Sequence, residues 1–272
     1  MLYVENELSY DQFHSENFYR FLYEEQTGDG ETRKFGIISV KTLEEFPEKI
    51  AGIEDVLLAR NHGAGPLLVA YKDVRFKTRD LFFTEADFFD YFNFKLLQGN
   101  PATALAGPND VVITESMAKK IFGDANPMGE TIKFSGTMGF TLQVTGVVED
   151  PKNSHVDFEF LVNFEVRDEI NDYLVMREGF AGSVYGYFKL APNTDPDDAS
   201  KLIKQHYLDY YKDRPDVVEA LARENYEFQS IQDIYFNSND VSFDEGFNKG
   251  NKQNILILGV IGAFVLLIAC MN

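Results

Sequence analysis

The apolar residues divide the chain into a long patterned region and an unbroken run near its C-terminal end. Ile255–Met271 carries no charged side chain and, apart from the thiol of Cys270, no hydrogen-bonding one. As a helix the run would span about 25 Å, close to the roughly 30 Å hydrocarbon core of a bilayer. A buried core helix usually keeps a polar face, and this run has none. We expect it to be the first part of a membrane-spanning helix that continues past residue 272.

Alternating apolar and polar residues predict strands before this run. In Phe140–Glu149 the apolar residues Phe140, Leu142 and Val144 alternate with polar ones, as in a strand with one buried face. We expect 131–135 to pair with it as a hairpin, and 32–40 to pair with 19–23 across the turn 27–30. Further strands are predicted at 56–59, 67–71, 111–113, 184–190 and 226–231.

Apolar spacings of three and four predict helices between these strands. One begins after the capping pair Asp195-Pro196 and runs to about residue 211. A second is capped by Thr114 and ends at Gly123. A third is expected to be capped by Thr42 and to reach about residue 50. Strand–helix–strand units therefore occur in both the first and the last third of the chain.

The composition narrows the function classes. The 44 acidic and 25 basic residues give a net charge of −19, all of it outside the apolar run, and such a surface repels nucleic acid. Aromatic residues make up 14%, too many for a disordered acidic chain, and we expect the seven in 80–94 to form core. The single cysteine, Cys270, lies in the apolar run, so the rest has no disulfide or cysteine nucleophile.

No stretch of the sequence carries a strong signal for a catalytic or ligand-binding site. The stretch 123–131 has the wrong spacing, and Glu130 in place of a lysine, for a phosphate-binding loop. His155, Asp157 and Glu159 alternate along one stretch, and we interpret them as the solvated face of a strand and not as metal ligands. The stretch 240–251 lacks the glycine and final acid of a calcium loop. The other histidines are scattered, and His206 is expected in the core. The sequence thus singles out no catalytic, cofactor-binding or metal-binding residue.

Five ordered stretches together resemble a known family: ELSYDQFH (7–14), DVVITESMAKKIFGDANPMGETIKF (110–134), VTGVVEDPKNSHVDFEF (144–160), IQDIYFNSN (231–239) and NILILGVIGAFVLLIACMN (254–272). They are similar to the MacB-like periplasmic core domain, and the start of the following membrane helix, in FtsX/MacB-type ABC transporter permeases. The likeness is strongest to large permeases of Bacteroidetes-type bacteria.

The resemblance implies an α+β domain of two lobes. A Porter-like lobe of β-α-β units would comprise residues 1–77 and 166–252. A Sabre-like lobe would be inserted at 78–165, and 253–272 would begin a transmembrane helix, truncated here. A preceding transmembrane helix is expected just before residue 1.

The resemblance also implies a function. Such permeases work with a separate cytoplasmic ATP-binding subunit and a second permease copy, and in some cases with a periplasmic adaptor or a protein or peptide substrate. ATP hydrolysis below the membrane drives movement above it, a mechanotransmission used in export, lipoprotein extraction or cell-envelope control. Residues 1–254 would be periplasmic, anchored in the bacterial inner membrane. The mixed charges before the apolar run agree, since a cytoplasmic flank usually has excess Lys and Arg.

Two other classes of protein fit the sequence less well. The chain would be the ectodomain of a membrane-anchored sensor or binding receptor if a signalling domain followed. A tethered hydrolase would need a polar constellation in a pocket, for which the row from His155 to Glu159 is the nearest candidate. We expect no enzymatic activity and no cofactor.

Overall fold

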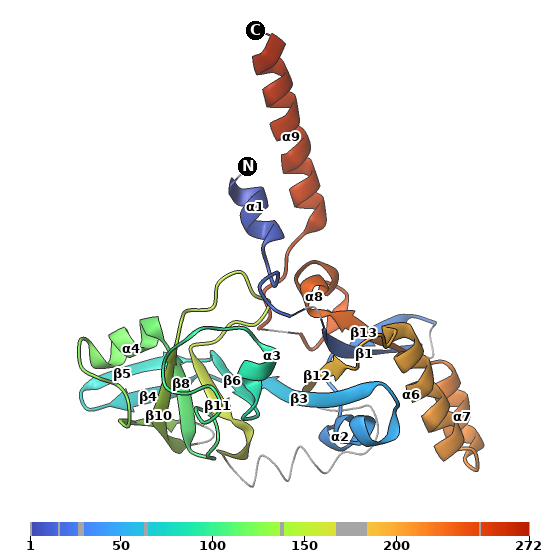
Figure 1. Ribbon diagram of the computed structural model, residues 1–272, viewed down its shortest axis with the longest axis horizontal. Coiled ribbons are helices and arrows are strands. Elements are labelled where there is room, and N and C mark those ends of the chain that lie inside the picture. The colour runs from blue at the N-terminus through green and yellow to red at the C-terminus, as the bar shows by residue number, and fades with distance from the viewer. Residues whose placement is uncertain are drawn as a thin grey trace.

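The chain folds as an α+β protein around one mixed sheet (Figure 1). The computed structural model describes residues 2–15, 17–26, 30–62, 65–136, 139–166, 184–244 and 246–271. The strands are β1 (Phe18–Gln26), β2 (Thr32–Phe35), β3 (Ile53–Asn61), β4 (Leu67–Tyr71), β5 (Val74–Thr78), β6 (Leu81–Thr84), β7 (Leu96–Gln98), β8 (Asp110–Thr114), β9 (Thr131–Ser135), β10 (Phe140–Val148), β11 (Phe160–Asn163), β12 (Tyr185–Leu190), β13 (Asn225–Ser230) and β14 (Val241–Ser242).

The helices lie on both sides of this sheet and at one end of the molecule. They are α1 (Leu2–Leu8), α2 (Val40–Lys49), α3 (Phe88–Tyr91), α4 (Glu115–Phe122), α6 (Pro196–Tyr210), α7 (Pro215–Ala222), α8 (Ile231–Asn237), α9 (Lys252–Met271) and a 3-10 turn, η1 (Phe164–Val166).

The sheet passes without a break through two halves of the molecule. Its order is β14-β2-β1-β12-β3-β6-β11-β8-β10-β9-β4-β5, with β13 paired to β1 and β7 to β10. The half built from the first and last thirds of the chain carries α2, α6 and α7, and the other half carries α4 (Figure 1). We call the second half the inserted lobe, since its strands come from the middle of the chain.

The two halves meet where β3 pairs with β6. Their antiparallel ladder is short, running from Ala59 opposite Thr84 to Asn61 opposite Phe82. Beyond the ladder, side chains take the place of backbone hydrogen-bond partners. The Leu58 N–H donates to the Glu85 carboxylate at 2.6 Å, and the Thr84 hydroxyl donates to the Leu58 carbonyl at 3.3 Å. The Leu58 peptide is therefore satisfied where the ladder ends.

Two hydrophobic cores lie on opposite faces of the sheet. Successive residues of a strand alternate between them: Val111 and Ile113 belong to one core, and Val112 belongs to the other. Both cores extend through both halves. Six of the seven aromatics in 80–94 are buried, which confirms that this stretch is core. They are Phe82, Phe83, Phe88, Tyr91, Phe92 and Phe94.

Local sequence signals set most element boundaries. The Thr114 hydroxyl accepts from the Met117 N–H at the start of α4, and Gly123, with φ of 62°, ends that helix. The Asp195 carboxylate accepts from the Asp197 N–H at the start of α6. These caps confirm the predicted starts. The predicted turn residues 27–29 lie outside the described residues, but the strands that they join, β1 and β2, do pair.

One predicted boundary is wrong. The helix α2 begins at Val40, three residues earlier than a cap at Thr42 would place it, because the Ser39 hydroxyl is the group that accepts from the Thr42 N–H. The strand before it ends at Phe35, five residues earlier than predicted.

Both described ends of the chain leave the domain on the same side (Figure 1). The helix α1 lies beside α9. No residue of α9 is buried, and α9 is long and apolar enough to cross a membrane. This is therefore the side on which a membrane-crossing α9 would enter the bilayer.

Candidate functional site

A short turn of the inserted lobe lies between the two chain ends. Residues 153–156 belong to the connection from β10 to β11, and the segment 9–15 follows α1. The Asp11 N–H donates to the Asn153 carbonyl at 2.7 Å, and the Asn153 amide donates to the Ser9 hydroxyl at 2.7 Å. Asp11 and Asn153 both have left-handed backbones, with φ of 60° and 52°. Both residue types tolerate this conformation better than most.

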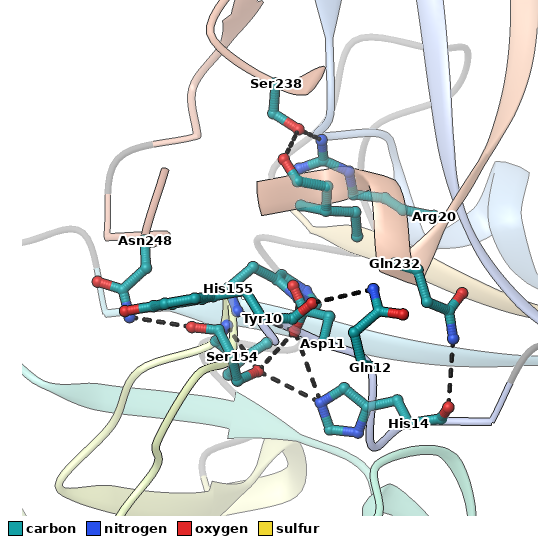
Figure 2. Close-up of polar contacts among 12 residues, drawn as sticks. Tyr10, Asp11, Gln12, His14, Arg20, Ser154, His155, Gln232, Ser238 and Asn248 are labelled. Atoms are coloured by element: carbon teal, nitrogen blue, oxygen red, sulfur yellow. Dashed lines mark hydrogen bonds and ion pairs between the residues drawn. The ribbon is translucent and has the colours of Figure 1, made fainter. Parts of the chain in front are cut away.

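The Asp11 carboxylate is the centre of this contact (Figure 2). Its Oδ1 accepts from the Ser154 hydroxyl at 2.9 Å, from the His155 N–H at 2.9 Å and from His155 Nδ1 at 2.8 Å. Burial opposes ionisation of Asp11, but the charge and hydrogen bonds of His155 outweigh it and hold its pKa below the usual value. Asp11 is therefore an ionised acceptor that attaches the N-terminal segment to the turn.

His14 supports the same turn from another direction. Its Nδ1 accepts from the Asn93 N–H at 3.2 Å, which leaves the proton of a neutral ring on Nε2, 3.3 Å from the Ser154 hydroxyl. Burial and the neighbouring His155 lower the pKa of His14 to about 3, although Asp11 opposes the shift. The ring is thus neutral and donates to Ser154, which in turn donates to Asp11.

His155 extends the network to the other half of the molecule. Its Nε2 lies 3.0 Å from the Tyr187 hydroxyl on β12. Both side chains are fully buried. Hydrogen bonds in such a low-dielectric site are stronger than in water, and an unpaired group is correspondingly costly. The His155 ring therefore links the N-terminal segment to the central strand β12.

The segment that leads into α9 holds the same turn from the opposite side (Figure 2). The Asn248 N–H donates to the His155 carbonyl at 2.9 Å, and its side-chain amide donates to the Ser154 carbonyl at 3.0 Å. Phe247 forms a β-bridge with Val156. Both membrane-facing ends of the chain thus contact the same few residues of the inserted lobe.

The contact of the segments 9–15 and 247–248 with the turn 153–156 is called the polar junction. A buried ion pair lies next to it. Arg20 of β1 donates to Asp244 at 2.6 Å, to Gln229 at 2.7 Å and to the Ser238 hydroxyl at 2.8 Å. Lys249 lies 3.4 Å from the other oxygen of Asp244. These contacts fix the chain before α9 to the sheet. The region 240–251, rejected as a calcium loop, therefore serves as an anchoring segment.

The polar junction has the residue types of a hydrolase but not its arrangement. In a catalytic triad a histidine lies between serine and carboxylate, whereas Ser154 donates directly to Asp11. Asp11, His14, Ser154 and His155 are each at most 4% exposed, so a substrate has no access. Among the described residues no group of three or more His, Cys, Asp or Glu is arranged to hold a metal ion. The arrangement is suited to holding chain segments together.

The structure corrects the expected row of His155, Asp157 and Glu159. Only Asp157 is exposed, whereas His155 is completely buried and is bonded to Asp11. The histidines are also less scattered than expected, since His14 and His155 share this network, while His206 is partly exposed and not in the core. The signal for the site was two short segments, YDQFH and NSH, each combining small polar groups with histidine.

A second polar feature is a cleft between the halves, lined by carboxylates. Glu44 of α2 and Asp55 of β3 face Glu85, Asp87 and Glu165 of the inserted lobe. Burial raises the pKa of Glu85 to about 7, with the Leu58 hydrogen bond opposing and neighbouring acids adding to the shift. Burial and nearby acids likewise raise the pKa of Asp87 to about 6. Protonation of this cleft therefore changes near neutral pH.

The fold and the paired chain ends define an α+β domain joined on one side to a candidate membrane helix. Residues 1–206 match the profile of the MacB-like periplasmic core domain, and the chain belongs to that family. It is the periplasmic domain of a MacB/FtsX-like ABC transporter permease. No curated protein sequence matches it.

Three solved structures share the fold. A domain of a protein assigned as a permease, from Porphyromonas gingivalis, is 19% identical with a TM-score of 0.60, over 79% of this chain and 90% of that one. The periplasmic region of MacB from Actinobacillus actinomycetemcomitans is 17% identical with a TM-score of 0.50, over 80% and 90%. The extracellular domain of the noncanonic ABC-type transporter YknZ from Gram-positive bacteria is 13% identical with a TM-score of 0.51, over 79% and 100%.

Proposed function

We propose that the chain couples ATP hydrolysis by a separate cytoplasmic subunit to a conformational change outside the membrane. The observation that carries this proposal is the side-by-side exit of α1 and α9 from one side of the domain. A movement of membrane helices continuous with these two segments would reach the domain at one place. The domain does not act as an enzyme: its histidines and Ser154 hold chain segments together.

The proposal includes the partners and the location. The permease works with a cytoplasmic ATP-binding subunit and a second copy of itself, and contacts a periplasmic adaptor or a protein or peptide substrate. It lies in the bacterial inner membrane, with residues 1–254 in the periplasm. The export, extraction and envelope-control roles all use the same mechanotransmission.

The division into lobes is part of the same proposal. Residues 1–77 and 166–252 form the Porter-like lobe and 78–165 the Sabre-like lobe. The pairing of β4 with β9 favours moving the first boundary back to residue 67.

Spin labels on the two copies test the coupling. Lys133 of β9 is exposed on the inserted lobe. Lys133→Cys gives one label per copy once Cys270 and every other native cysteine of the full permease are replaced by alanine. In the full permease and its ATPase in lipid nanodiscs, we expect the distance between labels to shift between the nucleotide-free and ATP-bound states. An ATPase unable to bind ATP is the control. The same distance in both states would contradict the proposal.

A further inference from the structure

Besides the two hydrophobic cores that both halves share, the inserted lobe has two hydrogen-bonded attachments of different character. The first is the short antiparallel ladder between β3 and β6, which is three residue pairs long. The second is the polar junction at residues 153–156, which lies on the side that faces the membrane. The chain segments that contact residues 153–156 therefore hold the inserted lobe at a place separate from the ladder between β3 and β6.

The point attachment depends on one carboxylate. Three of its contacts converge on Asp11 Oδ1, all from Ser154 and His155. Ionised acceptors form stronger hydrogen bonds than neutral ones. Without this carboxylate, the buried Ser154 hydroxyl and the His155 ring would lose a partner that no water can easily replace.

Each hydrogen bond of this network has a defined donor and a defined acceptor, which restricts the network to one geometry. His14 donates to Ser154, Ser154 donates to Asp11, and His155 donates to Asp11 while its Nε2 meets Tyr187. Apolar surfaces can slide and repack, whereas each of these contacts is lost by a displacement of about 1 Å. The network is therefore suited to transmitting a movement.

We propose that Asp11 is the positioning residue of a polar clamp, formed with His14, Ser154 and His155, that fixes the inserted lobe to the two membrane-facing ends of the chain. Asn248 closes the clamp from the α9 side. A displacement of either end would then reach the inserted lobe directly, without passing through the sheet of the other half. The role of the clamp in the transport cycle rests on the proposed function; its mechanical role does not.

A glycine substitution removes the clamp cleanly. Asp11 has a φ of 60°, where glycine is at least as comfortable as aspartate, so Asp11→Gly removes the side chain without straining the turn. Asn193 is a matched control, since it is exposed, has a φ of 69° and lies in the turn between β12 and α6. Asn193→Gly makes the same kind of change outside the clamp.

The clamp is measured without nucleotide, by the distance between α1 and the inserted lobe. Labels at Glu5→Cys and Lys133→Cys report this distance when the labelled copy is diluted with unlabelled copies in nanodiscs, in a background in which Cys270 and every other native cysteine is replaced by alanine. We expect one narrow distribution in the parent and in Asn193→Gly, and a broad one in Asp11→Gly. A distribution in Asp11→Gly as narrow as in the control would overturn the clamp.

A milder variant covers the case in which Asp11→Gly fails to fold, as judged by circular dichroism. Tyr187→Phe removes only the hydroxyl that meets His155 and leaves the ring packed. We expect a broadening between those of the control and Asp11→Gly, and no broadening would count against the clamp.

The label pair at Lys133 in the two copies tests the role of the clamp in the transport cycle separately from the clamp itself. If the parent shows no ATP-dependent shift, the proposed function fails whatever the clamp does. If the parent shows the shift and Asp11→Gly loses most of it while its ATPase still hydrolyses ATP, the clamp is the coupling element. A full shift in Asp11→Gly would overturn that role.

Discussion

Arg20 is a fully buried cation whose partners come from distant parts of the chain. It lies on β1, and its ion-pair partner Asp244 is also buried. Taking two charges out of water costs several kcal/mol each, and the hydrogen bonds to Gln229 and Ser238 help to offset that cost. A pair of this kind adds little net stability, but removing one member leaves an uncompensated buried charge.

Asp244→Ala is therefore expected to destabilise the domain by about 3–5 kcal/mol. Glu219→Ala, which breaks the exposed pair between Glu219 and Arg223 on α7, should cost less than about 1 kcal/mol. Denaturant unfolding of both variants in detergent micelles measures the difference. Equal losses would show that the buried pair has no special weight.

Glu85 makes the folding stability of the domain depend on pH in a defined direction. Its pKa rises from 4.5 in its ordinary state to about 7 in the folded protein. The folded state thus binds this proton more tightly than the unfolded chain. The stabilising contribution is fully present at low pH, is lost as the pH rises from about 4.5 to about 7, and does not change further above that window.

Glu85→Gln isolates this contribution, because glutamine keeps an acceptor for the Leu58 N–H and cannot ionise. We expect the variant to match the parent near pH 4.5 and to become more stable by about 2 kcal/mol at pH 8, a figure reduced from the pKa shift for partial exposure. The measurement is the difference in thermal midpoint between variant and parent across this range. A difference independent of pH would be inconsistent with a buried, titrating Glu85.

At the scale of elements, short-range signals were enough to predict most helices and strands. Thr114, Gly123 and Asp195 act through residues within one helical turn, so their roles are visible in the sequence. Ser39 shows the limit even there. Ser39 and Thr42 are both of residue types that cap helices, and the local sequence does not decide between them.

The candidate site could not be predicted in this way. His155 was placed on a solvated face because alternation predicted a strand, but its partner Asp11 lies 144 positions away. A buried histidine is satisfied by whatever the fold brings to it, and no local pattern records that partner. The same holds for Arg20 and Asp244, which are 224 positions apart. The resemblance to a known family supplied the two lobes, whereas the junction between them had to be seen in the structure.

At the scale of the whole molecule, an acidic folded domain is joined to an apolar helix that it does not cover. The net charge of −19 lies outside the apolar run. Large apolar residues of α9 such as Leu256, Phe264 and Met271 are 61–79% exposed. An apolar surface of this extent on a water-soluble protein drives association. A bilayer is the environment that removes this surface from water.

A chain that ends after Asn251 is therefore expected to keep the fold of the acidic domain and to lose the association that α9 drives. The clamp and the Arg20 ion pair use residues up to Lys249, so the shortened domain should keep its fold and its thermal midpoint. It should also remain monodisperse without detergent, whereas the chain with α9 should aggregate unless detergent or lipid is present. Light scattering and circular dichroism of both chains, with and without detergent, make the comparison. If the shortened chain unfolded, α9 would be part of the domain's core, and if the longer chain stayed monodisperse in plain buffer, α9 would not be a membrane helix.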